Sequence, residues 1–420
     1  MAAVLLAFII LVLLTLRQNI LVILLVAAGY VHLVWGQGVL SYLIEDMWIA
    51  VDNEALLAIP MFIIAGNIMT RGSIAKRLVN VMIALTRPIP GGLAVATILS
   101  CAVFAAISGS SPVTMLAVGT ILLPALLGEG YDRRFSLGAV ASGGTLGILI
   151  PPSIPLIIYG VVTEISIYEL FVAGIIPGLI MTGALALYSL WRCRAMPRQS
   201  FSVPELGEAM KKGIWALFMP FLLIGGIYSG YFSPTEAAAV AILYGVLIEM
   251  FVHREVTPRD LYDCLVEAAR LLGMLVPIIA VAISIKTLLT LEQVPQNLTA
   301  WVSTIVESKI AFLLAMNLLR LVVGCLFDAL AAILILGPLL MVAGMAFGID
   351  PVHLGIIMVI NLEIGFLTPP VGMNLIVATT AFNAKFGEMC MAALPFIGIL
   401  LLVLGVVSFV PETALILLGR

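Results

Sequence analysis

Apolar stretches long enough to cross a membrane recur from one end of this 420-residue sequence to the other. A helix needs about 20 consecutive apolar residues to cross the roughly 30 Å of bilayer hydrocarbon, where its backbone polar groups must be bonded internally. Hydrophobic residues make up 63% of the chain and charged residues only 10%, whereas soluble domains are about 25% charged. The sequence therefore predicts an all-α polytopic membrane protein with about ten transmembrane helices.

Charge and residue spacing exclude several other classes of protein. The net charge of −3 provides no field that would attract nucleic acid. The five cysteines lack CxxC spacing, and His32, His253 and His353 are isolated from one another. An intramembrane metalloenzyme would need clustered ligands such as HExxH, and the sequence has no such cluster. We therefore expect a protein that is not an enzyme and carries no cofactor.

The distribution of lysine and arginine predicts the orientation of the spans, because basic loops stay in the cytoplasm. Arg17 follows the first span, so the N-terminus is expected outside, and the final span is expected to end outside as well. Residues 192–212 form the densest basic loop, which we expect inside. The segments Gln37–Glu54 and Thr257–Arg270 are predicted to lie in the outer and inner interfaces, respectively.

Residues 91–162 depart from a simple pattern of spans. The apolar segment 91–128 has basic residues on both sides and Ser108-Gly-Ser-Ser-Pro112 at its middle, which predicts a hairpin that enters from and returns to the cytoplasm. The next span, 135–162, contains adjacent prolines at 151 and 152. Two prolines remove two backbone donors and clash with the preceding turn, so this helix should be broken.

The second half of the chain repeats both features with opposite orientation. A hairpin over 310–347 should break at Gly324–Asp328 and open outward, and a span over 352–382 should break at Pro369–Pro370. Paired interrupted helices of this kind are the best sequence pointer to a transporter site. The predicted organisation is 1–54 scaffold and outer interfacial segment, 55–195 first inverted half, 196–270 scaffold and inner interfacial segment, and 271–420 second inverted half.

Broken helices at mid-membrane expose main-chain groups that can bind ions and substrate. Freed carbonyls coordinate a cation such as Na⁺, and freed amides at a helix N-terminus attract an anion. Asp328, an acid at a hairpin tip inside the membrane, is a functional candidate by default. Glu363 and Lys286 are also candidates, although each could lie near a span end and extend to the interface.

Structural explanations compete with each of these assignments. Glycine and proline are frequent in membrane helices and often only kink them. Gly143 and Gly147 could serve helix packing alone, and the serines near 108 could be local caps. Asp328 could pair with Arg320, two helical turns earlier, although one straight helix makes that contact difficult.

Seven motifs resemble one known family. The chain is similar to the large membrane subunit (DctM-like) of tripartite ATP-independent periplasmic (TRAP) transporters, over most of its length and in the same order. The motifs that carry this resemblance are Ile59-Pro-Met-Phe-Ile-Ile-Ala-Gly66, Ser108-Gly-Ser-Ser-Pro-Val-Thr-Met115, Gly130-Tyr131, Gly147-Ile-Leu-Ile-Pro-Pro-Ser153, Ser233-Pro-Thr-Glu-Ala-Ala-Ala239, Gly348-Ile-Asp-Pro-Val-His353 and Thr368-Pro-Pro-Val-Gly372.

The resemblance implies a fold, an activity and partners. The fold would be an elevator, in which a transport domain with two hairpins moves against a scaffold. Na⁺ would be the coupling ion for uptake of an organic acid, commonly a C4-dicarboxylate. A periplasmic substrate-binding protein (DctP-like) would deliver the substrate, and a small four-helix membrane subunit (DctQ-like) would complete the scaffold. No four-helix region precedes Met1, so we expect the unfused form in the bacterial inner membrane, with periplasmic termini.

The resemblance also implies site residues. The first sodium site would use Ser108, Ser110, Ser111, Gly147, Ile150 and Pro152. The second would use Gly324, Asp328, Gly365, Thr368 and Met373. The expected substrate-binding residues are Ser110, Ser111, Thr114, Pro151, Asp328, Asn361, Pro369 and Asn374.

The substrate and the mechanism remain open after this comparison. Some sialic-acid members of the family carry aspartate at the position of Thr114, so threonine there argues against sialic acid. A sodium/dicarboxylate elevator symporter that needs no binding protein is the nearest alternative, but it usually bears Ser-Asn-Thr at each tip. A channel would more typically show a symmetric oligomeric filter than two inverted halves.

Overall fold

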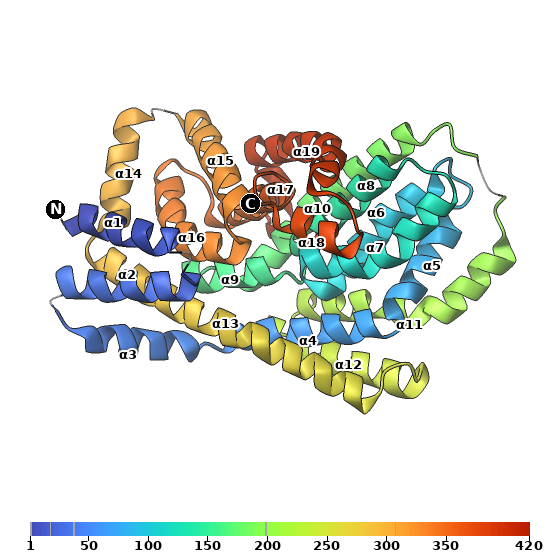
Figure 1. Cartoon of the computed structure of the whole chain (residues 1–420), viewed down its shortest axis with the longest axis horizontal. Helices are drawn as coiled ribbons and strands as arrows, with labels where there is room; N and C mark the ends of the chain where they lie inside the picture. Colours follow the sequence, from blue (N-terminus) through green and yellow to red (C-terminus); the bar gives the residue numbers. More distant parts are fainter. Residues whose placement is uncertain (1, 17, 37, 198–199, 307) are drawn as a thin grey trace.

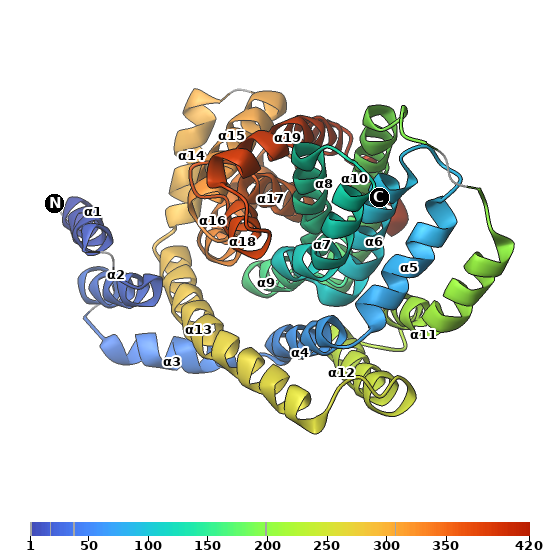
Figure 2. The same cartoon turned by 45° about the vertical axis from the view of Figure 1, so that its right-hand side comes forward.

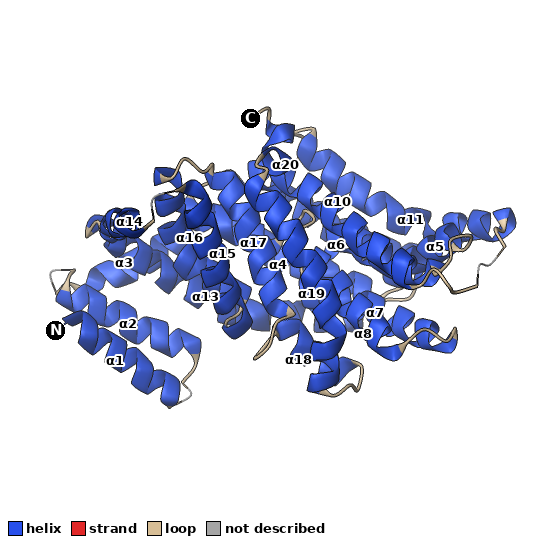
Figure 3. Cartoon of the chain, turned by 90° about the horizontal axis from the view of Figure 1, so that it is seen from above, coloured by secondary structure: helices blue, strands red, loops and turns tan. Residues whose placement is uncertain are grey.

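The computed structural model describes residues 2–16, 18–36, 38–197, 200–306 and 308–420. All regular secondary structure in these ranges is helical (Figure 3), which confirms the all-α part of the predicted fold class. Nine helical segments in them are long and apolar enough to cross a membrane, compared with the predicted ten or so spans and two hairpins. Arg17 and Gln37, used above for orientation and for the start of the outer segment, lie outside these ranges.

An outer arc of helices curves around an inner bundle (Figures 1 and 2). The long helix α13 packs against α2, α3 and α4, and α4 in turn packs against α12, while α5 packs against α11. The helices of the arc are α1 (Ala2–Thr15), α2 (Ile20–Val34), α3 (Leu40–Val51), α4 (Ala58–Arg71), α5 (Ile74–Thr86), α11 (Val203–Tyr228), α12 (Pro234–Val246) and α13 (Pro258–Leu291).

The inner bundle contains both predicted hairpins and both broken helices (Figure 2). α17 is its central helix, since every residue from Val352 to Phe366 is buried. The helices of the bundle are α6 (Gly92–Ser108), α7 (Ser111–Gly128), α8 (Arg133–Thr145), α9 (Ile154–Thr163), α10 (Ile167–Arg192), α15 (Lys309–Leu326), α16 (Ala329–Ala346), α17 (Pro351–Phe366), α18 (Met373–Ala381) and α19 (Phe386–Phe409); α14 (Val294–Ile305) lies beside α16 and α20 (Glu412–Leu415) ends the chain.

The four predicted breaks are confirmed at their positions. The first hairpin turns at Gly109, whose φ of +59° is accessible to glycine without a steric penalty, and the second turns at Phe327–Asp328. The first broken helix is interrupted between α8 and α9, and the second between α17 and α18. Each interruption holds one cis peptide bond, Pro151–Pro152 and Pro369–Pro370, so the two halves are alike at this level.

Three helices differ from the sequence-based expectation. Thr257–Arg270 is not a separate interfacial helix, because these residues form the first part of α13. This helix has 34 residues and is about 51 Å long at 1.5 Å per residue. A capping box between Thr257 and Asp260 starts this helix, and no proline pair interrupts it. Two amphipathic helices, α5 and α14, were not among the spans and hairpins expected from the sequence.

A buried carboxylate from a distant helix caps α5. Glu249, in the π-helical turn Leu247–Val252 after α12, is fully buried and accepts hydrogen bonds from the backbone N–H groups of Ser73 (2.8 Å) and Ile74 (2.6 Å). His253 Nδ1 lies 3.4 Å from the same carboxylate. Because Ser73 makes no side-chain cap of its own, Glu249 supplies the acceptor that the free N–H groups of a helix start require.

Substitution of Glu249 by glutamine should therefore destabilise the protein. We expect a loss of about 2 kcal/mol, because charge-assisted hydrogen bonds to two buried donors are weakened. Thermal unfolding of the purified protein in detergent would show this as a lower midpoint. Glu208→Gln is the control: Glu208 pairs with Lys212 on the exposed surface of α11, where such pairs contribute little. Equal midpoints for the two variants would contradict the capping role.

Candidate functional site

A cavity of about 490 Å³ lies where the two hairpin tips approach each other. It is of the size that small-molecule sites occupy. The first tip contributes Ser108–Val113 and the second contributes Asp328–Leu330. The first broken helix contributes Ile148, Ile154 and Pro155, and the second contributes Phe366 and Met373. All four interrupted segments therefore meet at one place.

The opposite wall of the cavity comes from the outer arc. Its residues are Ile63, Gly66 and Asn67 of α4 and Leu271, Met274 and Leu275 of α13. No lysine, arginine or histidine is among the described residues that line the cavity, whereas Asp328 is. No sequence motif predicted this second wall, although Asn67 is a polar residue within an apolar span.

The first tip presents hydroxyls and a helix N-terminus to the cavity. Ser108 Oγ lies 2.6 Å from Thr114 Oγ1, so the two hydroxyls are bonded to each other across the turn. Ser110 is the N-cap of α7, but its side chain makes no capping hydrogen bond. The first N–H groups of an α-helix have no intrahelical partner. The start of α7 can therefore bind an anion through backbone donors and the helix dipole.

The second tip presents a carboxylate. Asp328 is the N-cap of α16, and its Oδ2 accepts a hydrogen bond from the backbone N–H of Leu330 at 3.0 Å. Its side chain is partly exposed where it lines the cavity. Arg320, named above as a competing partner, forms no ion pair with it in the part of the chain that the structure describes. The second tip thus carries negative charge where the first has hydroxyls.

Each tip is packed directly onto the broken helix of its own half. A methyl group at Gly147 would lie 2.5 Å from Ser110 O, and one at Gly365 would lie 2.7 Å from Gly324 O. Gly109 O accepts a hydrogen bond from Ile154 N at 3.2 Å, and in the second half Cys325 O accepts one from Val371 N at 3.3 Å. The two halves therefore use the same contact between a tip carbonyl and an amide just after the double proline.

Polar side chains behind the cavity connect the two halves. Asn374 Nδ2, at the start of α18, donates to Ser111 Oγ of the first tip at 2.7 Å. Asn361 Nδ2 donates to Asn317 Oδ1 at 2.8 Å. Glu363 is fully buried on the central helix α17, so the idea that it extends to the interface is wrong. Lys286 lies near the C-terminal end of α13 and pairs with Glu164 at 2.6 Å.

The expected site residues fall into two groups by position. Those that line the cavity are Ser108, Ser110, Ser111, Asp328 and Met373. The residues that do not line it are Thr114, Gly147, Ile150, Pro151, Pro152, Gly324, Asn361, Gly365, Thr368, Pro369 and Asn374. In the second group, Gly147 contacts the first tip and Gly365 contacts Gly324, whereas Asn361 is enclosed between helices. The two expected sodium sites thus correspond to the two contacts between tip and break.

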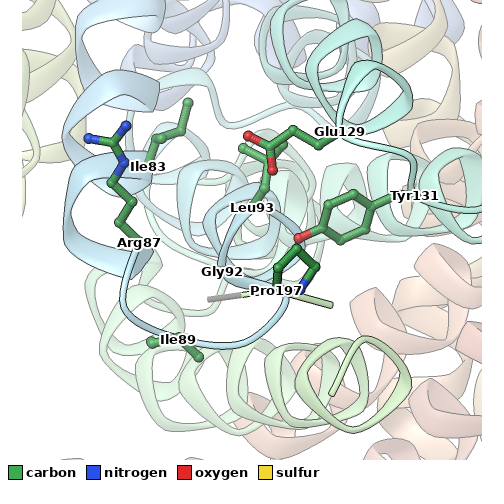
Figure 4. A pocket seen from close by; sticks show the side chains of 8 residues that line it. All are labelled: Ile83, Arg87, Ile89, Gly92, Leu93, Glu129, Tyr131 and Pro197. Carbon is green, nitrogen blue, oxygen red and sulfur yellow. The ribbon is translucent and has the colours of Figure 1, made fainter. Parts of the chain in front are cut away.

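A second pocket lies away from the tips, between the starts of α6 and α8 (Figure 4). Its volume of about 30 Å³ is close to that of one water molecule, so it is too small for an organic acid. Arg87, Glu129 and Tyr131 are among its lining residues. Burial raises the pKa of Tyr131 to about 12, which keeps its hydroxyl protonated at neutral pH.

Comparison with known families identifies the relatives of this arrangement. A family model described as tripartite ATP-independent periplasmic transporter, DctM component, matches residues 6–413. The chain belongs to the DctM family. This confirms the resemblance drawn from the motifs, and the curated DctM relatives are transporter permeases rather than enzymes.

Two DctM relatives show how far the similarity extends. The C4-dicarboxylate TRAP transporter large permease protein DctM of Pseudomonas aeruginosa is 43% identical over 371 residues, which cover 87% of this chain and 86% of that protein. The isethionate TRAP transporter permease protein DctMQ of Oleidesulfovibrio alaskensis is 41% identical over 384 residues. This chain spans 60% of that relative's length, and the matched residues are 90% of the chain.

A third relative and two solved structures complete the comparison. The ectoine permease TeaC of Halomonas elongata is 37% identical over 93% of this chain and 92% of its own. The Alcanivorax borkumensis YdaH transporter shares the fold with a TM-score of 0.65 at 15% identity, covering 90% of this chain and 88% of that one. Neisseria gonorrhoeae MtrF gives a TM-score of 0.55 at 12% identity, over 88% and 83% of the two chains.

Proposed function

We propose that this DctM-family chain imports an organic acid, such as a C4-dicarboxylate, by sodium-coupled secondary transport. The observation that carries the proposal is the single cavity shared by both hairpin tips and both broken helices. Such a junction provides carbonyls for cations and helix N-termini for a carboxylate at the same place. The relatives named for C4-dicarboxylate, isethionate and ectoine transport support a small polar organic substrate.

The charge of the cavity explains why uptake would depend on cations. The described lining residues include Asp328 but no basic side chain, so an anionic substrate would meet net negative charge. A carboxylate transferred into such a site is unfavourable unless an opposite charge accompanies it. Na⁺ bound at the two contacts between tip and break would supply that charge next to the substrate. Coupling then follows, because substrate affinity is high only when the cations are bound.

The position of the cavity supports an elevator mechanism. It lies between the inner bundle and the outer arc, so sliding of the bundle along α4 and α13 would carry the bound substrate across. The pair between Lys286 of α13 and Glu164 at the end of α9 joins arc and bundle in this state. Its hydrogen bond holds the pKa of the Glu164 carboxyl below its usual range, so the pair persists at neutral pH. Sliding would break it at small cost, since Glu164 is largely exposed.

The proposal includes partners and a location. A periplasmic substrate-binding protein would deliver the acid, and a small four-helix membrane subunit would pack on the arc. Exposed aromatic side chains on α11, including Trp215, Phe218 and Phe221, fit a surface that faces lipid or another membrane helix. The chain would span the bacterial inner membrane many times, with both termini in the periplasm.

Reconstitution in liposomes tests the function. We expect uptake of a radiolabelled organic acid when an inward Na⁺ gradient is imposed and both the small subunit and the binding protein encoded nearby are present. Screening ligands by the melting shift of that binding protein selects the acid to be tested. Uptake by this chain alone, or uptake driven by a proton gradient in the absence of Na⁺, would contradict the proposal.

A further inference from the structure

The central helix of the bundle, α17, carries an acid that is not among the expected ligands of the two sodium sites. Glu363 of α17 is fully buried, and among the described residues the only polar side chain that interacts with its carboxyl group is the Ser111 hydroxyl. An ionised carboxylate in such surroundings is strongly disfavoured unless a positive charge accompanies it. A fully buried acid with a single hydroxyl partner, and no positive charge beside it among the described residues, therefore needs an explanation.

No basic side chain among the described residues provides that charge. Arg320, the buried arginine on the neighbouring helix α15, lies beside Tyr159 and forms no ion pair with Glu363 within the described chain. Glu249, the other fully buried glutamate, shows the contrast, because its carboxylate is bonded to two backbone amides. The lack of backbone donors to Glu363 within the described chain is therefore a feature of its place in the bundle and not of buried acids in this protein generally.

One hydroxyl lies beside Glu363, and this hydroxyl contacts a second polar side chain. The Ser111 side chain of the first tip lies next to its carboxyl, and Ser111 Oγ in turn accepts the 2.7 Å hydrogen bond from Asn374 Nδ2. The remaining amide oxygen of Asn374 is buried and likewise has no donor in the described residues. The group thus offers two carboxyl oxygens, one amide oxygen and a hydroxyl oxygen with a second lone pair. Acceptors outnumber donors here.

We propose that Glu363, Ser111 and Asn374 form a third cation site, which binds Na⁺ through side-chain oxygens. Hard cations prefer such oxygens, and a single positive charge neutralises the one carboxylate, whereas a divalent ion would leave net charge buried. The three residues come from α17, α7 and α18, so the site joins the first tip to the second broken helix. It is chemically distinct from the two sites built on unwound main chain.

The sequence of the two halves places this site in the second half only. Aligning Gly147-Ile-Leu-Ile-Pro-Pro with Gly365-Phe-Leu-Thr-Pro-Pro puts Thr145 opposite Glu363 and Leu156 opposite Asn374. Thr145 Oγ1 is satisfied by donating to Ser142 O. The inverted repeat therefore predicts two equivalent main-chain sites, and the side-chain site is an addition that breaks their symmetry.

Counting bound ions tests this inference, which rests on the proposed sodium coupling. Equilibrium binding of ²²Na⁺ would be measured on the purified full chain in nanodiscs, with choline replacing Na⁺. We expect Glu363→Gln to bind one Na⁺ fewer per chain than the wild type. Asn374→Leu should lose the same ion, and the double variant should also lose only one. Glu249→Gln, a buried glutamate outside the site, should bind as many ions as the wild type.

Melting curves separate a binding role from a structural one. Without Na⁺, Glu363→Gln should unfold at the wild-type temperature or above, because the amide removes a buried charge. With saturating Na⁺ it should gain less stability than the wild type. An unchanged ion count, as expected if Glu363 only carries a proton, would overturn the inference, and so would an equal loss of stability with and without Na⁺. If the wild type binds no Na⁺ at all, the proposed coupling itself fails.

Discussion

Gly365→Ala is expected to abolish sodium-dependent uptake while the protein still inserts and folds. A methyl group on Gly365 would lie 2.6 Å from Gly324 Cα and 2.7 Å from Gly324 O, both backbone atoms that cannot rotate away. The end of α15 must then move off α17, which separates the second tip from the broken helix. Overpacking of this kind costs about 1–3 kcal/mol, which corresponds to a roughly 5- to 150-fold weaker sodium affinity at this contact.

The measurement is ²²Na⁺ affinity together with uptake in liposomes containing both partners. Gly225→Ala is the matched control, because Gly225 lies within helix α11 and a methyl group there has nothing within 4 Å. It should transport as the wild type does. Gly147→Ala should behave like Gly365→Ala, since its methyl group would lie 2.5 Å from Ser110 O. Normal sodium affinity in Gly365→Ala would show that the contact between tip and break binds no ion.

The second large effect is expected for Asp328→Asn. Asparagine is as good an N-cap as aspartate, so the hydrogen bond to Leu330 N and the start of α16 should be retained. The substitution removes the only acid among the described residues that line the cavity. A cation held there loses its charged ligand, and we expect uptake to fall by about a hundredfold or more, in keeping with about 3 kcal/mol for a charge-assisted contact.

Asp350→Asn distinguishes this effect from loss of a helix cap. Asp350 caps α17 through Val352 N at 2.8 Å in the same way, but it lies at the far end of that helix and not at the cavity. Uptake measured at several Na⁺ concentrations should be normal for Asp350→Asn and lost for Asp328→Asn. If the two variants lose activity equally, or if Asp328→Asn retains uptake, the carboxylate at the tip has no role in binding.

The breaks could be predicted from sequence because glycine, serine and paired prolines act locally. Ser108–Pro112 and the two double prolines disfavour a helix whatever surrounds them, and the structure has its interruptions there. Helices α5 and α14 were missed because each is short and amphipathic, and looked like a polar loop in a sequence dominated by apolar spans. The continuity of α13 was missed because its composition changes at Arg270 although its backbone does not.

The candidate site was predictable only where main-chain groups of the hairpin tips and broken helices form it. The tips and the glycines that face them could be expected from the motifs, but the wall formed by Asn67 and Leu271 depends on how the arc wraps around the bundle. Glu363 illustrates the same limit. The sequence left open that it lies near a span end and extends to the interface, whereas packing of α17 on all sides encloses it completely. Burial set by tertiary contacts cannot be read from neighbours in sequence.

The hydrogen bonds from Ile154 to Gly109 and from Val371 to Cys325 limit how the substrate can be released. A hairpin that opened by itself would leave these carbonyl and amide groups without hydrogen-bond partners in a region poor in water. Neither hairpin is therefore built as an independent gate. If the chain transports an acid as proposed, we therefore expect access to the cavity to open by displacement of the inner bundle against the outer arc, with both hairpins still packed on their broken helices.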